Sequence, residues 1–177
     1  MTKLEERIRK AIRDVRDFPK EGIIFKDITP ILLDAQLCSD IVQFMADEYR
    51  SLGVDAVAGV ESRGFFFGFP LAMALDVPFI PVRKQGKLPF HTVSHSYNLE
   101  YGSAVVEMHS DAVKKNMRIL IHDDLLATGG TAGAAAGLVK KQGGKVAAYS
   151  FLVELGFLKG QEKLSKNQAA VHSLVKY

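Results

Sequence analysis

One segment, residues 117–138, constrains the fold more than any other part of the chain. It begins with an apolar run that is typical of a buried parallel strand, and it ends in an alanine-rich run that predicts a helix. Between the two runs lie Asp123 and Asp124, followed by Leu-Leu-Ala-Thr-Gly-Gly-Thr. Two carboxylates at the end of a strand are therefore expected beside a Gly/Thr turn at the start of a helix.

The loop in this segment favours a phosphate ligand. Its unpaired backbone N–H groups, over residues 128–131, lie at the positive end of the helix dipole, and its glycines allow a close approach to the backbone. The carboxylates of Asp123 and Asp124 would repel a phosphate, so we expect them to face sugar hydroxyls, a divalent cation or both. Neither the P-loop pattern nor the dinucleotide-binding pattern is present. A ligand with a phosphate, a ribose and a metal-bound group fits this layout.

The composition is that of one globular domain spanning residues 1–177. Hydrophobic residues make up 47% and charged residues 24%, and the mean hydropathy is near zero, which argues against a membrane protein and against disorder. Neither a signal peptide nor a membrane-spanning run is visible, so we expect a cytoplasmic protein without a membrane partner. The net charge of +3 is weak evidence for nucleic acid, and none is expected as a partner. The single cysteine, Cys38, excludes an intrachain disulfide and is expected to be at least half-buried.

Alternating apolar strands and amphipathic helices predict an α/β fold with a parallel central sheet flanked by helices. We expect helices over residues 3–16, 39–51, 65–75 and 159–166, and strands over residues 54–60, 77–82, 117–121, 145–155 and 170–177. Ser39 would cap the second helix. Pro78 and Pro81 favour positions at the ends of their strand, or an edge position for the strand itself.

Residues 83–110 interrupt this alternation. A basic turn over residues 83–89 precedes two expected strands, 91–97 and 104–108, which form a hairpin that could move relative to the sheet. The last strand, 170–177, also lies outside the alternation. We expect it to join the region around Phe25 in a small appended subdomain.

Three polar turns are expected at one edge of the sheet. Ligands bind to open parallel sheets beyond the carboxyl ends of the strands, and the turns at 61–64, 83–87 and 123–131 all follow strands. Arg63 can offer two hydrogen bonds to a diphosphate, and nearby lysines add positive charge. The combination indicates a site for a phosphorylated small molecule.

Five segments together resemble, in order, the motifs of the adenine phosphoribosyltransferases within the type I phosphoribosyltransferase family. They are residues 18–30, 61–65, 81–89, 97–102 and 123–131. The resemblance implies the reaction of adenine with phosphoribosyl diphosphate (PRPP) to give AMP and diphosphate, with Mg²⁺ as cofactor. It also implies a homodimer, a flexible β-hairpin lid over about residues 83–110, and a hood subdomain formed by about residues 18–35 and the C-terminal segment.

The resemblance assigns the residues that would bind PRPP and AMP. They are Glu61, Ser62, Arg63, Lys84, Lys87, Asp123, Asp124, Ala127, Thr128, Gly129, Gly130 and Thr131. Within this group, residues 127–131 would bind the 5′-phosphate, the two aspartates the ribose hydroxyls, and the three cations the diphosphate. The Glu61–Ser62 peptide matches a position that is cis in the family and would aim N–H groups at the diphosphate. Mg²⁺ would be bound mainly through the diphosphate and water.

The resemblance also assigns the adenine site and the catalytic groups. Adenine would stack on Phe25, its edge would be read by the Ile24 backbone, and Lys26 replaces the arginine that is usual in the family. Arg63, Glu100 and Tyr101 would be catalytic: Glu100 would be the proton partner of adenine N7, and Tyr101 would cover the site. His122 stands where the family usually has an apolar residue, and we expect it to be buried and hydrogen-bonded, without a catalytic role.

Two other functions share the expected fold. One is a phosphoribosyltransferase for another purine base, such as hypoxanthine or xanthine. The other is a PRPP-sensing regulator, which should add a DNA-binding domain or a strongly basic face. The aromatic run at residues 65–69 fits either a dimer interface or an ordinary buried helix.

Overall fold

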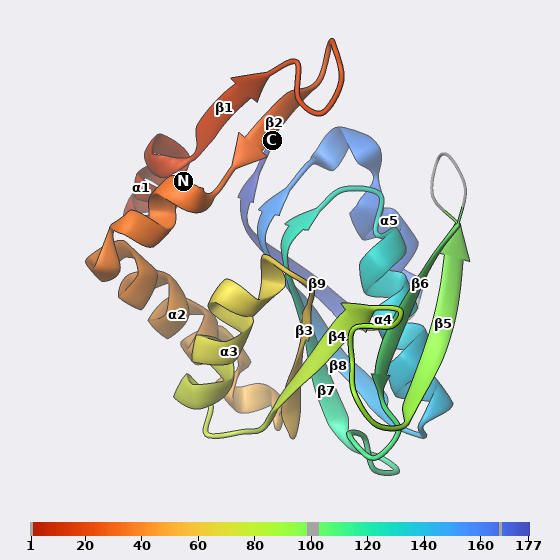
Figure 1. Cartoon of the computed structure of the whole chain (residues 1–177). Coiled ribbons are helices and arrows are strands. Elements are labelled where there is room, and N and C mark those ends of the chain that lie inside the picture. Colours follow the sequence, from red (N-terminus) through yellow and green to blue (C-terminus); the bar gives the residue numbers. More distant parts are fainter. Residues whose placement is uncertain (1, 99–102, 167) are drawn as a thin grey trace.

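The computed structural model describes residues 2–98, 103–166 and 168–177, and Figure 1 shows their arrangement. A sheet of seven strands forms the centre of the molecule, in the order β5-β6-β4-β3-β7-β8-β9. The strands are β3 (Ala56–Val60), β4 (Phe79–Lys84), β5 (Thr92–Asn98), β6 (Ser103–His109), β7 (Arg118–Leu126), β8 (Lys145–Glu154) and β9 (Ala170–Lys176). The five strands from β4 to β9 in this order pair in parallel, which confirms the predicted α/β fold.

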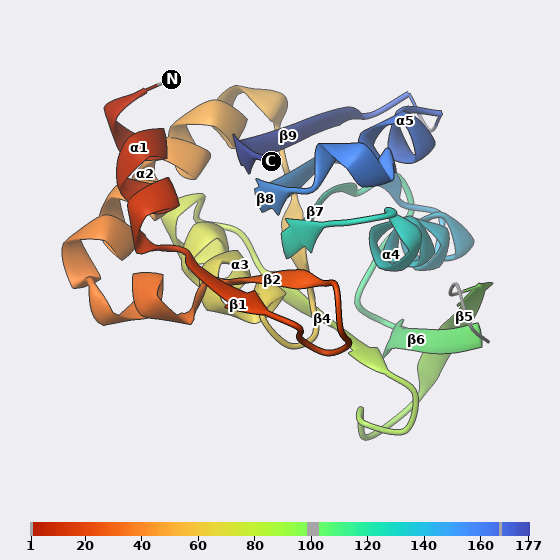
Figure 2. The same cartoon turned by 90° about the horizontal axis from the view of Figure 1, so that it is seen from above.

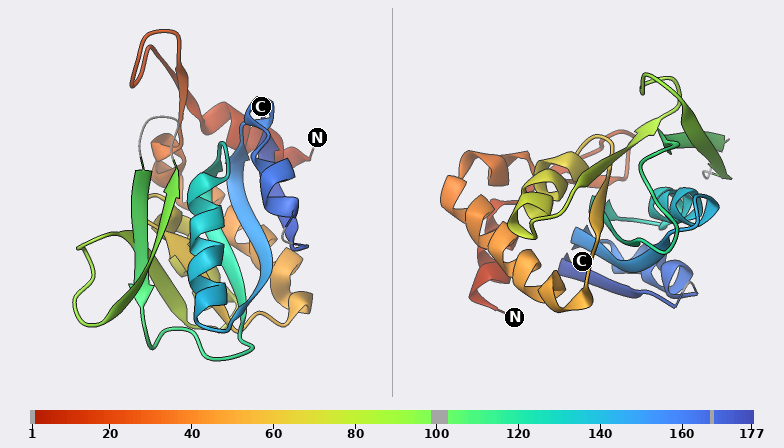
Figure 3. Two further views of the ribbon diagram at one scale, coloured as in Figure 1. Left: turned by 90° about the vertical axis from the view of Figure 1, so that its right-hand side faces the viewer. Right: turned by 90° about the horizontal axis from the view of Figure 1, so that it is seen from below.

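Helices cover both faces of this sheet (Figures 2 and 3). The α-helices are α1 (Lys3–Ala11), α2 (Ala35–Tyr49), α3 (Gly64–Ala74), α4 (Gly130–Lys141) and α5 (Gly160–Ser165). Short 3₁₀ turns span Thr29–Leu33, Arg50–Leu52 and Gly156–Leu158. One hydrophobic cluster packs α1, α2 and α3 against one face, and a second cluster packs α4 and α5 against the other. This two-sided burial explains why β3 is buried along its whole length and reads as a continuous apolar run.

A small hairpin lies apart from this sheet. Strands β1 (Arg13–Arg16) and β2 (Ile24–Asp27) pair in antiparallel fashion and extend beyond one end of the sheet (Figure 1). The prediction of one helix over residues 3–16 was therefore wrong at its C-terminal half. Ile12, which is buried, ends α1 in an extended conformation, and Val15 then pairs with Phe25 across the hairpin.

The start of α2, the end of β7 and the place of β4 also differ from the prediction. Helix α2 begins earlier than Ser39, because the Asp34 carboxylate accepts a hydrogen bond from the Leu37 N–H at 2.9 Å and caps the helix there. Strand β7 continues through both aspartates to Leu126, because its pairing with β8 continues that far. Strand β4 is internal in the strand order, but β6 pairs with it only at Arg83 and Lys84, so Pro81 lies where β4 pairs with β3 alone.

The C-terminal strand β9 belongs to the large sheet. It pairs in parallel with β8 and forms the outer edge of the sheet, and it is not a strand of the small hairpin. The residue that follows it nevertheless reaches the hairpin, since the Lys26 ammonium lies 4.1 Å from the centre of the Tyr177 ring. Among the described residues, no helix has the length and apolar character needed to cross a bilayer.

Candidate active site

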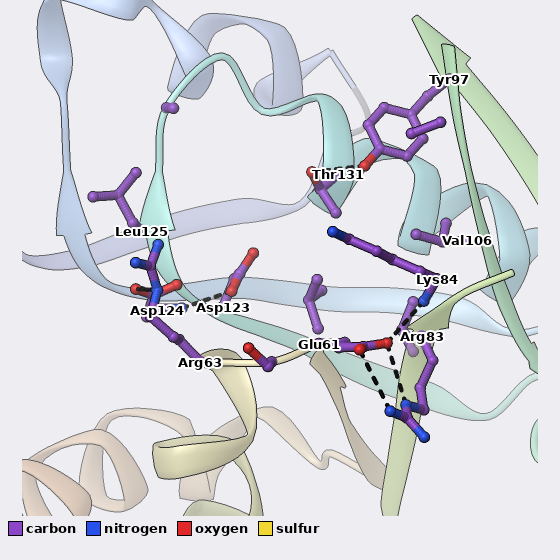
Figure 4. A pocket seen from close by; sticks show the side chains of 15 residues that line it. Glu61, Arg63, Arg83, Lys84, Tyr97, Val106, Asp123, Asp124, Leu125 and Thr131 are labelled. Carbon is purple, nitrogen blue, oxygen red and sulfur yellow. Dashed lines mark hydrogen bonds and ion pairs between the residues drawn. The ribbon is translucent and has the colours of Figure 1, made fainter. Parts of the chain in front are cut away.

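A cavity of about 530 Å³ opens at the carboxyl ends of β3, β4 and β7 (Figure 4). Its walls come from the turn after β3 at residues 61–63, from the last residues of β4 and β7 at 83–84 and 123–125, and from Ala127, together with Thr131 of α4 and Tyr97 of β5. The structure thus brings together the three polar turns that the sequence placed at one edge. The Glu61–Ser62 peptide in the first turn is cis.

The two aspartates form an anionic centre in this cavity. The Arg63 Nε atom lies 2.7 Å from Asp124 Oδ2, and the Asp124 side chain is almost fully buried. Burial and repulsion by Asp124 raise the pKa of Asp123 well above its usual range. Burial also raises the pKa of Asp124, although Arg63 opposes this effect. The pair therefore favours a ligand that brings hydrogen-bond donors, such as ribose hydroxyls.

Glu61 organises the basic side of the cavity. Its carboxylate accepts hydrogen bonds from the Lys84 N–H at 3.0 Å and from the Lys87 ammonium at 3.0 Å, and it pairs with the Arg83 guanidinium at 3.2 Å. Burial opposes ionisation of Glu61, but these three partners outweigh it and lower its pKa to about 2. Lys87 is therefore paired with Glu61 and is not among the residues that line the cavity. The Lys84 side chain extends into the space between Asp123 and Thr131 (Figure 4).

The loop before α4 forms a separate hollow of about 70 Å³. Gly129 has a φ of 73°, a conformation that favours glycine, and it precedes the first residue of the helix, Gly130. Ala127, Thr128, Gly129, Gly130 and Thr131 all line this hollow.

Gly160, which the sequence analysis did not single out, packs directly against this loop. A Cβ atom built on it would lie 2.2 Å from the Ala127 carbonyl oxygen. We therefore expect Gly160→Ala to push the loop out of place, with a loss of about 2 kcal/mol in the free energy of unfolding and weaker binding of phosphorylated ligands. Denaturant unfolding and calorimetry with AMP measure the two effects. Gly133→Ala is the matched control, because its Cβ would meet only Leu164 at an ordinary 3.8 Å.

The expected base-binding segment lies above this cavity, in the β1–β2 hairpin. The centre of the Phe25 ring is 5.0 Å from the Arg63 guanidinium, so Arg63 links this ring to Asp124. Ile24 is 54% exposed and open to a ligand. Lys26 instead pairs with Asp14 at 2.7 Å and contacts the Tyr177 ring, which directs its ammonium away from Phe25.

Two further residues at the site were missed or misjudged from the sequence. Tyr97 accepts a hydrogen bond from the Thr131 hydroxyl at 3.2 Å. The sequence analysis included Tyr97 only as part of the 97–102 motif and gave it no role. Glu107 is buried and accepts hydrogen bonds from the Lys87 and Leu88 N–H groups at 3.1 and 3.0 Å, which fixes the basic turn. An acid within the apolar strand over residues 104–108 was the available signal. Glu100 and Tyr101 lie outside the described residues.

His122, beside the site, and Cys38, away from it on α2, have the structural roles expected from the sequence. His122 is fully buried on β7, and its Nδ1 atom lies 3.1 Å from the Ser150 hydroxyl. Burial disfavours its charged form and lowers its pKa to about 4. Cys38 is partly buried, donates to the Ile31 carbonyl oxygen at 3.3 Å, and has a pKa raised by burial.

Comparisons with known proteins agree with this geometry. The model of the phosphoribosyl transferase domain matches residues 29–173. A curated adenine phosphoribosyltransferase from Cytophaga hutchinsonii is 55% identical over 174 residues, which cover 98% of this chain and 96% of that protein.

Solved structures give the same result. The adenine phosphoribosyltransferase of Thermoanaerobacter pseudethanolicus superposes with a TM-score of 0.93 at 49% identity, covering 97% of this chain and 99% of that one. The Saccharomyces cerevisiae enzyme, solved with an imino-altritol bisphosphate and adenine, superposes with a TM-score of 0.91 at 38% identity, covering 98% and 99%. This chain belongs to the phosphoribosyltransferase family, and within it to the adenine phosphoribosyltransferases.

Proposed function

We propose that this protein transfers the 5-phosphoribosyl group from PRPP to adenine, with AMP and diphosphate as products, as an enzyme of purine salvage. The observation that carries the proposal is the order of groups from the loop before α4 to the β1–β2 hairpin. The glycine-rich loop is followed by the Asp123–Asp124 pair, Arg63 and Phe25, and Arg63 contacts both Asp124 and the Phe25 ring. This order matches the phosphate, ribose and base of one nucleotide.

The proposed roles follow from these positions. The loop over residues 127–131 binds the 5′-phosphate, and the two aspartates bind the ribose hydroxyls. Arg63, Lys84 and the Glu61–Ser62 peptide line the side of the cavity where diphosphate would leave. Lys87 contributes its charge through Glu61. Because the Lys26 ammonium is engaged by Asp14 and Tyr177, adenine recognition rests on the Phe25 ring and the Ile24 backbone.

The chemistry requires breaking the bond between ribose C1 and the diphosphate oxygen while positive charge develops on the ring. Carboxylates beside the ribose stabilise that charge, and the cations stabilise the departing diphosphate. Alignment of adenine N9 with C1 supplies a further part of the rate enhancement. Glu100 is proposed as the proton partner of adenine N7, and Tyr101 as the residue that covers the base.

Mg²⁺ fits this site as an ion carried by the substrate. Among the described residues no group of three or more histidine, cysteine, aspartate or glutamate side chains could hold a metal ion. The adjacent carboxylates of Asp123 and Asp124 fit the coordination preference of Mg²⁺. This ion keeps several water ligands and binds one or two protein carboxylates in addition to substrate phosphates. When bound, the ion would neutralise charge on the diphosphate.

The overall organisation is also part of the proposal. We propose one domain over residues 1–177, with a lid over about 83–110 and a hood built from about 18–35 with the C-terminal segment. A homodimer is proposed because α3 exposes Phe66, Phe69 and Met73 on one face, at 43%, 53% and 67%. Light scattering in solution tests the dimer. PRPP and AMP are multiply charged and cross bilayers poorly, so we place the enzyme with them in the cytoplasm.

A base-competition assay tests the reaction. The purified protein is mixed with PRPP, Mg²⁺ and adenine, hypoxanthine, guanine or xanthine, and both nucleotide and diphosphate are measured. Formation of AMP from adenine alone is the expected result. A nucleotide from another base would instead assign a different purine specificity, and PRPP binding without any nucleotide would favour a PRPP-sensing regulator.

Replacing the Phe25 ring tests the adenine site. Phe25→Ala is expected to raise the KM for adenine about tenfold, because the aromatic contact contributes about 1 kcal/mol or somewhat more. The KM for PRPP should change little, since Phe25 does not line the phosphoribosyl cavity. Phe157→Ala is the control, because Phe157 is 71% exposed and lies outside that cavity. Equal increases in both KM values would show that Phe25 has only a structural role.

A further inference from the structure

We propose that Tyr97 is a positioning residue for the phosphate end of the active site. We also propose that Gly137 of α4 allows the close packing of β5 that places Tyr97 there. The proposal rests on the proposed function, because it assigns the nearby loop to the 5′-phosphate. It concerns β5 and α4, two elements that are distant in sequence and packed together (Figure 1).

The first observation is the contact between Tyr97 and the start of α4. The Thr131 hydroxyl donates to the Tyr97 hydroxyl at 3.2 Å. The Tyr97 ring lies against Gly130, where an added Cβ would come within 3.4 Å of it. Tyr97 therefore covers the first turn of the helix whose N-terminus would bind the phosphate, and Figure 4 shows its hydroxyl turned toward Thr131.

The second observation explains what places Tyr97. His95 lies two residues earlier, on the same face of β5, and its ring lies directly over Gly137. An added Cβ on Gly137 would come within 2.6–2.8 Å of three ring atoms of His95, so only a glycine allows this close approach. The Lys141 ammonium adds a hydrogen bond to the Ser94 carbonyl oxygen at 3.4 Å. β5 thus packs along about three turns of α4, with Tyr97 at the phosphate end of the contact.

The chemistry of two paired hydroxyls gives Tyr97 its role. A phosphate accepts hydrogen bonds only, and each hydroxyl carries one proton. Without a ligand the Thr131 proton lies between the two oxygens. When a phosphate binds, the Tyr97 hydroxyl can donate to the Thr131 oxygen instead, which leaves the Thr131 proton for the phosphate. The contact also restricts the rotation of the Thr131 hydroxyl, so this group is oriented before the phosphate arrives.

Calorimetry on Tyr97→Phe tests the assignment with two probes, ribose 5-phosphate and inorganic diphosphate. We expect the Kd for ribose 5-phosphate to rise about fivefold to tenfold, and the Kd for diphosphate to stay within about twofold. Similar losses for both probes would show that the substitution only disturbs the fold, and would overturn the proposal. Unchanged binding of both probes would overturn it too. Failure of the wild-type protein to bind ribose 5-phosphate would instead contradict the proposed function itself.

A double-mutant cycle tests whether Tyr97 acts through Thr131. If it does, Tyr97→Phe combined with Thr131→Val should bind ribose 5-phosphate no more than about twofold less tightly than Thr131→Val alone. Fully multiplied losses would mean that the two side chains act independently, which contradicts a positioning role.

The role of Gly137 is tested by a matched pair of glycine substitutions on α4. Gly137→Ala must displace the His95 ring that packs β5 on α4, so we expect it to reproduce the selective loss of ribose 5-phosphate affinity. Gly133→Ala adds the same methyl group to the same helix without a close contact, and should bind both probes as the wild type does. Equal behaviour of the two variants would refute the role of Gly137.

Discussion

Replacing both Asp123 and Asp124 with asparagine is expected to weaken PRPP binding by about a hundredfold. Asparagine keeps a hydrogen-bond acceptor but loses the charge. A hydrogen bond to a charged group contributes about 1.5–3 kcal/mol, so losing the charge-assisted part at each residue costs roughly a factor of ten. Calorimetry with PRPP measures the effect, and Asp111→Asn, at an exposed position, is the control.

The single variants separate the two carboxylates. Asp123→Asn leaves the ion pair between Arg63 and Asp124 in place, so its effect should be confined to PRPP. Asp124→Asn removes the charged partner of Arg63, which also contacts the Phe25 ring, so it should raise the KM for adenine as well. PRPP binding at wild-type affinity in the double variant would refute the ribose assignment.

Stability measurements distinguish this loss of binding from misfolding. Burial and the neighbouring Asp124 raise the pKa of Asp123, so the folded protein holds a proton there more tightly than the unfolded chain does. At neutral pH this difference in proton affinity costs stability, and the cost falls as the pH decreases toward the ordinary pKa of aspartate. Asp123→Asn should raise the melting temperature of the ligand-free protein while reducing the further increase caused by PRPP. A lower melting temperature without ligand would point to a damaged fold.

The sequence predicted the parts of the site that are contiguous in the chain. Residues 117–138 contain the strand, the two acids, the glycine-rich loop and the helix in the predicted order, although the strand continues through both acids. The parallel sheet followed from apolar runs that are buried on both faces. Family motifs extended this to the Phe25 segment, which local patterns alone gave no reason to place near Asp124.

Contacts between distant segments were not accessible in the same way. Gly160 lies against Ala127, and Tyr97 against Thr131, because of how α5 and β5 pack on the sheet, and no local pattern encodes either contact. The strand β1 was missed because its four residues follow a helix in one charged, amphipathic run. Strand β9 was expected to join the hairpin because a lone terminal strand carries no signal for its partner; its pairing with β8 decides the matter.

His122 is expected to lower the free energy of unfolding as the pH falls from about 6.5 to about 4. Its pKa is about 4 in the folded protein, against about 6.5 in an unfolded chain, because its ring is buried and has only Ser150 as a recorded hydrogen-bond partner among the described residues. Between these pH values the unfolded state binds more protons, so stability falls as the pH decreases from about 6.5 to about 4. The integrated loss is roughly 3 kcal/mol.

The variant His122→Leu isolates this contribution. Any cavity or packing change that it introduces shifts the free energy of unfolding equally at every pH, whereas the histidine effect depends on pH. Urea unfolding of the two proteins between pH 4 and pH 8 should therefore give a difference that is constant above about pH 7 and moves in favour of the variant by roughly 3 kcal/mol at pH 4. His172→Gln, which alters a partly exposed ring, is the control.

The neighbouring Asp123 requires one additional comparison. The raised pKa of Asp123 and the lowered pKa of His122 make stability change with pH in opposite directions. The pH dependence of the wild-type protein therefore understates the contribution of each residue. Repeating the His122→Leu comparison in the Asp123→Asn background removes the aspartate from both members of the pair. The same difference near pH 4 in both backgrounds would assign the effect to the buried imidazole. A difference that disappears without Asp123 would show that the two side chains titrate as one coupled unit.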